Sequence, residues 1–310
     1  MEAARDTEPS AAPAMNGSGH TDQTRANSAE AASVRAAQAL AEPCPTCAPT
    51  PLTSPAESSY VYVIGEIDWR FPDASLENEF HQVRHATNVE GLTQQEIEKK
   101  ILAENRYLAR QVCWVMRSQT VETYVLLPRD TADYARFVAG LRPNTRNDYD
   151  LVIGVRNGPA PPDTCGGLSV DLVFVDQIYS FNRDILLDEI KKPPKANAQE
   201  FANSSREVFD LIQQMGDNQG NQDRHRAGNY LAVRSKDIYV KAHSLYEEGY
   251  RAQQIVGVPS RLSGTRGRRI IDVIFDFEHG TRATRKFFVR VDVTGEYPFI
   301  VTPAQDYFER

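Results

Sequence analysis

The residues best suited to chemistry are four cysteines: Cys44, Cys47, Cys113 and Cys165. Cys44 and Cys47 form a C-x₂-C pair, a spacing that lets two thiolates face one metal ion. Two glycines follow Cys165 and would let the backbone turn tightly around a ligated sulfur. Four thiolates would complete the tetrahedral shell of a structural zinc ion. The sequence therefore predicts a zinc site formed by all four cysteines.

Two other uses of these cysteines stay open. Cys113 lies in an apolar segment and could be a packed core thiol, with Cys44 and Cys47 as free thiols. A redox use is the third alternative, although a redox C-x-x-C usually opens a helix and this one lies in a proline-rich stretch. Disulfides are disfavoured if the chain is cytoplasmic.

A second group of candidates lies around His225, in the polar segment 217–229. His225 could be a general base, a metal ligand or a substrate contact, with Asp217 or Asp223 orienting it. Asn229 and the exposed-looking Arg261 are candidate contacts for a substrate or partner, and the arginines near Arg261 would suit an anion or an acidic peptide. The alternative is a helix start with capping residues, and a solvated loop leading into a strand.

Familiar catalytic motifs are absent from the sequence. It contains no G-x-x-x-x-G-K phosphate loop, no G-x-G-x-x-G after a strand, no G-x-S-x-G and no H-E-x-x-H. This absence favours a binding role over an enzymatic one.

The candidates have to be positioned by a mixture of strands and helices. Apolar periodicity predicts strands at 60–67, 113–116, 122–127, 151–155 and 168–175, with helices beginning near Asp73, Thr93 and Asp130. Helices are expected next at 182–191, 198–215, 223–234 and 236–249, and strands at 253–258, 269–278, 285–293 and 298–302. Because regular βαβ alternation is missing, the order predicts an α+β fold with a mixed or antiparallel sheet and a central helical block.

The N-terminal stretch differs in composition from the rest of the chain. Residues 1–57 contain few large apolar side chains and cannot bury enough surface to offset the entropy of ordering. We therefore predict a disordered tail over residues 1–42, a linker with the Cys-Pro-Thr-Cys zinc knuckle over 43–59, and a single folded domain over 60–310.

Charge and hydropathy limit the partners. The net charge of −7 gives no electrostatic argument for nucleic acid. The N-terminus lacks the basic start and apolar core of a secretory signal. No segment reaches the roughly 20 apolar residues of a membrane helix. These features predict a cytoplasmic protein without a membrane or nucleic-acid partner, and they leave a homodimer open.

Six ordered strings carry a family resemblance: YVYVIGEIDWRFP at 60–72, NRYLARQVCW at 105–114, ETYVLLPRD at 122–130, VDQIYSF at 175–181, HRAGNYLAVR at 225–234 and FVRVDVT at 288–294. Together they resemble the C-terminal domain of the cyanobactin maturation proteins PatA and PatG, over about residues 60–310. Some members of that family carry an upstream Cys-Pro-Thr-Cys, so the resemblance also favours zinc.

The resemblance implies a place in the maturation of ribosomally made peptides. Members are usually fused to a subtilisin-like protease, which these 310 residues do not contain. We therefore expect an accessory binding or scaffold subunit that holds a precursor peptide or partner enzymes. The alternative is a peptide-modifying enzyme of the same pathway that uses His225 or a metal centre.

Overall fold

The structure is a computed structural model that describes residues 59–142, 147–194, 196–264 and 267–308. The described residues belong to one compact unit. The tail predicted for residues 1–42, and the predicted linker with Cys44 and Cys47 up to residue 58, lie outside the described residues.

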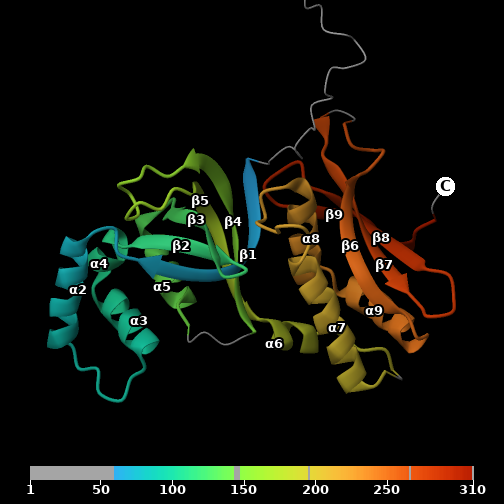
Figure 1. The fold of residues 1–310 in the computed structure, drawn as a ribbon, viewed down its shortest axis with the longest axis horizontal. Helices are drawn as coiled ribbons and strands as arrows, with labels where there is room; N and C mark the ends of the chain where they lie inside the picture. Colours follow the sequence, from blue (N-terminus) through green and yellow to red (C-terminus); the bar gives the residue numbers. More distant parts are fainter. Residues whose placement is uncertain (1–58, 143–146, 195, 265–266, 309–310) are drawn as a thin grey trace, which may run out of the picture. The chain divides into compact units, whose positions relative to one another are not determined.

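The first five strands form a closed barrel (Figure 1). They are β1 (Tyr60–Arg70), β2 (Cys113–Ser118), β3 (Val121–Pro128), β4 (Asp148–Pro159) and β5 (Asp171–Asn182), in the order β1-β2-β3-β5-β4. Neighbours are antiparallel except β3 and β5, which run parallel. The first half of β1 pairs with β4 and the second half with β2, so β1 closes the ring.

Four helices pack against the barrel core: α2 (Ala74–Ala86), α3 (Gln94–Glu104), α4 (Arg106–Gln111) and α5 (Tyr134–Gly140), the last preceded by the 3₁₀ turn η1 (Thr131–Asp133). Asp73 caps α2, and Thr93 forms a capping box with Glu96 at the start of α3. Both caps satisfy backbone donors at the helix start, which is why the sequence marks these two starts clearly.

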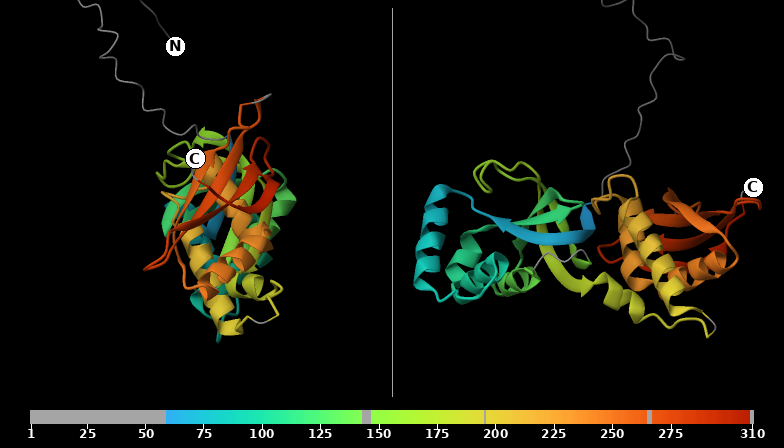
Figure 2. Two further views of the ribbon diagram at one scale, coloured as in Figure 1. Left: turned by 90° about the vertical axis from the view of Figure 1, so that its right-hand side faces the viewer. Right: turned by 60° about the horizontal axis from the view of Figure 1, so that its bottom comes forward.

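The second half of the chain places helices on a four-stranded antiparallel sheet (Figures 1 and 2). The helices are α6 (Arg183–Asp188), α7 (Ala198–Gln213), α8 (Asp223–Arg234) and α9 (Lys236–Glu247). The sheet has the order β6-β7-β8-β9, with β6 (Arg251–Pro259), β7 (Ile270–Glu278), β8 (Arg285–Asp292) and β9 (Phe299–Asp306). Buried residues of α7, α8 and α9 share one core with the inner face of this sheet.

Strand β1 contributes to two cores at once. Val61 and Val63 belong to the core inside the barrel, whereas Tyr62 and Ile64 belong to the core beneath α7 and α8. Side chains alternate between the two faces of a strand, so adjacent residues of β1 serve different cores. The outer face of β1 and β4 in the barrel therefore packs against the helical layer.

The predicted α+β class is confirmed, with one mixed barrel and one antiparallel sheet. Within the described residues, no helix is long and apolar enough to cross a membrane.

Candidate functional site

His225 lies in the first turn of α8 and is fully buried. Its Nε2 lies 3.0 Å from the carbonyl oxygen of Gly216, and its Nδ1 is buried without a hydrogen-bond partner. Burial, and secondly the positive charge of Arg224, lower the pKa of His225 from 6.5 to about 4. The imidazole is therefore neutral at neutral pH and bonded to the backbone.

The two predicted orienting carboxylates do not hydrogen-bond to His225. Asp217 is exposed and has a left-handed backbone with φ 52°. Asp223 lies 3.1 Å from Arg269 and 3.7 Å from Arg226. The structure thus brings the three predicted residues into one region without forming a hydrogen-bonded acid–histidine pair.

Asn229 is fully buried at a junction between α8 and the barrel. Its side-chain amide donates to Tyr62 O at 2.8 Å and exchanges hydrogen bonds with Asn218 at 2.7 and 3.0 Å. Nearby, Tyr62 N donates to Gly220 O at 3.0 Å. These bonds join the loop before α8 to β1, so Asn229 is inaccessible to a partner in this structure.

Arg226, which the sequence analysis did not single out, is a buried cation beside this junction. Its guanidinium donates to Val293 O at 2.7 Å, to Glu296 O at 3.2 Å and to Gly295 O. Burial lowers the pKa of Arg226 to about 10. These bonds hold the loop between β8 and β9 against α8.

The same loop carries Glu296, one member of a pair of carboxyl groups that sequence reasoning also missed. Burial, together with a hydrogen bond to the Asp176 carboxylate of β5, raises the pKa of Glu296 to about 7. Arg129 donates to Asp176 Oδ2 at 3.1 Å. The two acids are 120 positions apart in the sequence, and no local pattern links them.

Two of the four predicted zinc ligands do come together. Cys113 on β2 and Cys165 in the loop after β4 are joined by a disulfide, with their Cα atoms 5.5 Å apart. Disulfide sulfurs are not thiolates, so this pair could serve zinc only when reduced. Cys44 and Cys47 lie outside the described residues, within which no three His, Cys, Asp or Glu side chains are grouped to hold a metal. The four-cysteine zinc site stays a prediction.

Arg261 is exposed, two positions after the end of β6. Two nearby arginines are already paired: Arg268 lies 2.6 Å from Asp292, and Arg269 lies 3.1 Å from Asp223. Among the described residues Arg261 has no ion-pair partner, so its charge faces solvent beside the β6 edge.

Strand β6 is an edge of the sheet and the side chains of its outer face are exposed. Val256 and Val258 have exposed fractions of 38% and 39%. In contrast, Ile274 of β7, which pairs with Val256, is 7% exposed. Exposed apolar side chains on this sheet face therefore follow β6 toward Arg261, and Phe299 of β9 is exposed at the other edge.

Comparison with known proteins gives two family matches and one similar solved structure. Residues 60–248 match the model of the PatG Domain, and residues 195–307 match that of the PatG C-terminal region. A structure titled "PatG Domain of Unknown Function" is 20% identical with a TM-score of 0.64, over 81% of this chain and 99% of that chain. At this identity the structural match supports the fold alone. No curated protein matches this sequence.

Proposed function

The chain belongs to the PatG domain family, and from that premise we propose that its folded part is a peptide-binding subunit in the maturation of ribosomally made peptides. It holds an extended segment of a precursor peptide, or of a partner enzyme, along the β6 edge. The observation that carries the proposal is that β6 is the sheet edge best able to accept another strand.

Few strand edges are available in the described residues. The barrel is closed, so each of its strands already has two neighbouring strands. The sheet has two edges, β6 and β9. Pro303 interrupts β9 and has no N–H to donate, and the β8–β9 register shifts twice. Prolines and bulges are features that block pairing at sheet edges. Strand β6 has one register shift, between Ala252 and Gln254, and carries proline only as its last residue, so its stretch from Gln254 to Val258 is regular.

The phase of the β6–β7 ladder shows which backbone groups of β6 face outward. Ser260 N donates to Ile270 O at 2.8 Å. In an antiparallel pair, alternate residues bond to the partner strand. Val258 and Val256 therefore bond to β7, while Ile255 and Gly257 direct their N–H and C=O groups away from it. An added peptide strand would pair with these two residues.

The side chains around this edge favour a peptide of particular composition. Apolar side chains of an added strand would pack across from Val256 and Val258. An acidic residue of the peptide would then meet Arg261, whose guanidinium has no acidic partner among the described residues. We therefore favour an apolar, extended segment with an acidic residue at one end.

The test uses the full chain and a synthetic extended peptide of apolar residues with one acidic residue at its end. Calorimetric titration should give a micromolar Kd, and hydrogen exchange should show new protection at Ile255 and Gly257. Val258→Lys should weaken binding about fivefold because it removes an apolar cross-strand contact. Gln305→Lys, which adds the same charge on β9, is the matched control and should bind normally.

Two outcomes would contradict the proposal. One is no binding at micromolar concentration. The other is binding with protection elsewhere and no difference between the two lysine variants. The enzymatic alternative centred on His225 has less support, because His225 is 0% exposed and hydrogen-bonded to the backbone.

A further inference from the structure

We infer that a groove between α7 and α9 is a second binding site, which takes an alkylammonium group from a free amine or from a lysine side chain. This inference goes beyond the β6 edge and does not depend on it. It rests on a buried histidine nitrogen without a hydrogen-bond partner, in a groove lined by glutamates.

The groove has a volume of about 390 Å³. Each helix supplies polar residues at helical spacing, so they fall on one face. The lining residues used below are Glu200, Ser204 and Glu207 of α7, and His243, Tyr246 and Glu247 of α9.

His243 is 1% exposed, and its contact with Ser204 places a proton on Nδ1. The Ser204 hydroxyl donates to Phe201 O at 3.0 Å. It therefore accepts from His243 Nδ1, which lies 3.2 Å away. In the neutral ring this leaves a lone pair on Nε2. Nε2 is buried and has no hydrogen-bond partner.

In the neutral ring, the lone pair of Nε2 faces another acceptor. Glu247 Oε1 lies 3.5 Å from Nε2, and the Glu247 side chain is 48% exposed on the helix surface. Two acceptors that face each other without a hydrogen between them are unfavourable. A donor that hydrogen-bonds to both would stabilise them. An ammonium group has three donors and a positive charge, and it would reach Nε2 after a small rotation of the exposed carboxylate.

The charge of the groove also favours a cation. Three glutamates line it against one arginine, Arg251. Arg251 donates to Tyr250 O at 2.7 Å and stacks over the Tyr246 ring at 5.0 Å, and it forms no ion pair with the three glutamates. Burial, together with a hydrogen bond to Glu207, raises the pKa of Tyr246, so its phenol is a neutral donor to that carboxylate. Glu200 and Glu247 are left without a Lys or Arg partner among the described residues.

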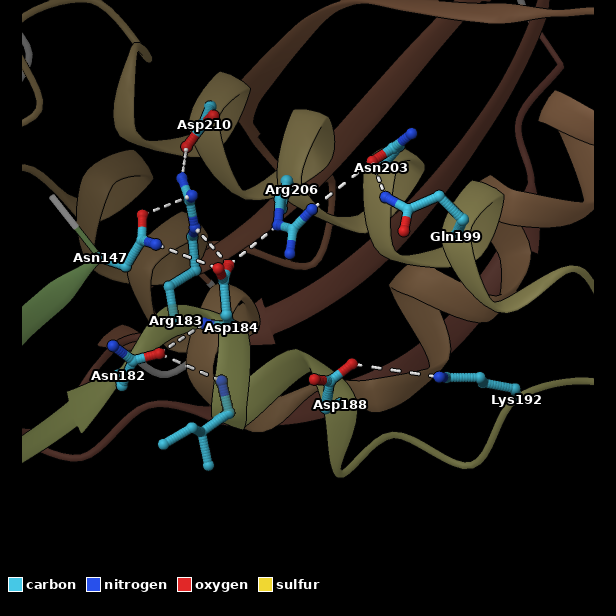
Figure 3. Close-up of polar contacts among 11 residues, drawn as sticks. Asn147, Asn182, Arg183, Asp184, Asp188, Lys192, Gln199, Asn203, Arg206 and Asp210 are labelled. Carbon is cyan, nitrogen blue, oxygen red and sulfur yellow. Dashed lines mark hydrogen bonds and ion pairs between the residues drawn. The ribbon is translucent and has the colours of Figure 1, made fainter.

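Residues of α7 adjacent to the groove face hold this wall of the groove in place. Arg183 donates to Asp210 Oδ1 at 2.8 Å and to Asn147 Oδ1 at 2.8 Å, and Arg206 donates to Asp184 Oδ1 at 2.9 Å (Figure 3). This network ties α7 to α6 and to the start of β4. The network therefore limits movement of the helix that carries Glu200, Ser204 and Glu207.

The test is an NMR titration of the full chain, labelled with ¹⁵N in histidine, with n-butylamine and with an acetyl-Gly-Lys-Gly-amide peptide. The expected result is a shift of the His243 Nε2 resonance, starting from the Nδ1–H tautomer. Glu247→Gln should weaken binding about fivefold, because it removes one charge at a partly exposed site. Glu104→Gln, the same change at the exposed end of α3, is the matched control and should bind as the wild type does.

The two probes separate the sources of the ammonium group. Binding of both supports a site for amines in general, and binding of the lysine peptide alone supports a lysine side chain. The norleucine analogue of the peptide must not bind. The inference is overturned if neither probe shifts His243, if Glu247→Gln has no effect, or if His243 is already doubly protonated at neutral pH without amine.

Discussion

His225 should make the folded chain sensitive to mild acid. Its pKa is lowered from 6.5 to about 4 in the fold, chiefly by burial. The unfolded chain therefore takes up a proton below pH 6.5 that the folded chain takes up only near pH 4. Folding stability is then lost as the pH falls through this window, and it is fully present above it.

The size of this loss follows from the pKa difference. A difference of one in pKa corresponds to about 1.4 kcal/mol. For His225 the largest loss is therefore about 3 kcal/mol near pH 4. The ring is fully buried, so solvent screens little of this effect.

Urea unfolding of the wild type and His225→Gln between pH 4 and pH 7 measures the effect. Glutamine can still donate to Gly216 O but does not titrate. The stability difference between wild type and variant should rise with pH by about 2–3 kcal/mol and level off above pH 6.5. A pH-independent difference, or one that falls as the pH rises, would refute the reasoning.

Three further predictions concern other groups of the fold. The pKa of Glu296 is raised from its ordinary value of 4.5 to about 7. The protonated side chain therefore stabilises the fold fully below pH 4.5, and this stabilisation is lost as the pH rises through 7. Glu296→Gln should remove this loss, which we put at about 1 kcal/mol because the group is partly exposed, and urea unfolding measures it. The Cys113–Cys165 disulfide closes 52 positions of sequence, so its reduction should cost about 2–4 kcal/mol in the same assay. The alternative is the four-cysteine zinc site. It is correct if elemental analysis finds one zinc per chain that is lost in Cys44→Ser, and if mass spectrometry finds free thiols at Cys113 and Cys165. The disulfide would then not be the native state of these two cysteines. Asn229→Ala should lower stability by about 1–3 kcal/mol by leaving buried groups such as Tyr62 O unpaired, and unchanged thermal unfolding would contradict this role.

The individual elements of the fold were accessible from the sequence because their signals are local. The capping residues Asp73 and Thr93 and the apolar periodicity of α7 each act within a few positions. Barrel closure is a long-range property. It depends on β1 pairing with β4 some 90 positions away, and on the parallel contact of β3 with β5, neither of which leaves a local pattern.

The burial of the site residues was harder to predict than the elements, because the residue type of a polar side chain does not show whether it faces solvent or the interior. His225 and Asn229 stand in a polar segment that resembles a solvated helix start, yet both are fully buried. Arg261 does lie on the surface. His243 was overlooked, although its spacing of four from Glu247 in a predicted helix was a usable signal. Its link to Ser204 depends on the packing of two helices.

Because β1 packs into two cores, truncation of the chain should expose part of one of them. A fragment ending at residue 194 would retain every barrel strand but lose α7 and α8. Tyr62, Ile64, Leu151 and Ile153 would then form an apolar strip open to water, since they are now buried beneath those helices. Such a fragment should aggregate instead of remaining monomeric. The two regions matched by the family models share residues 195–248 and should behave in solution as one cooperative folding unit.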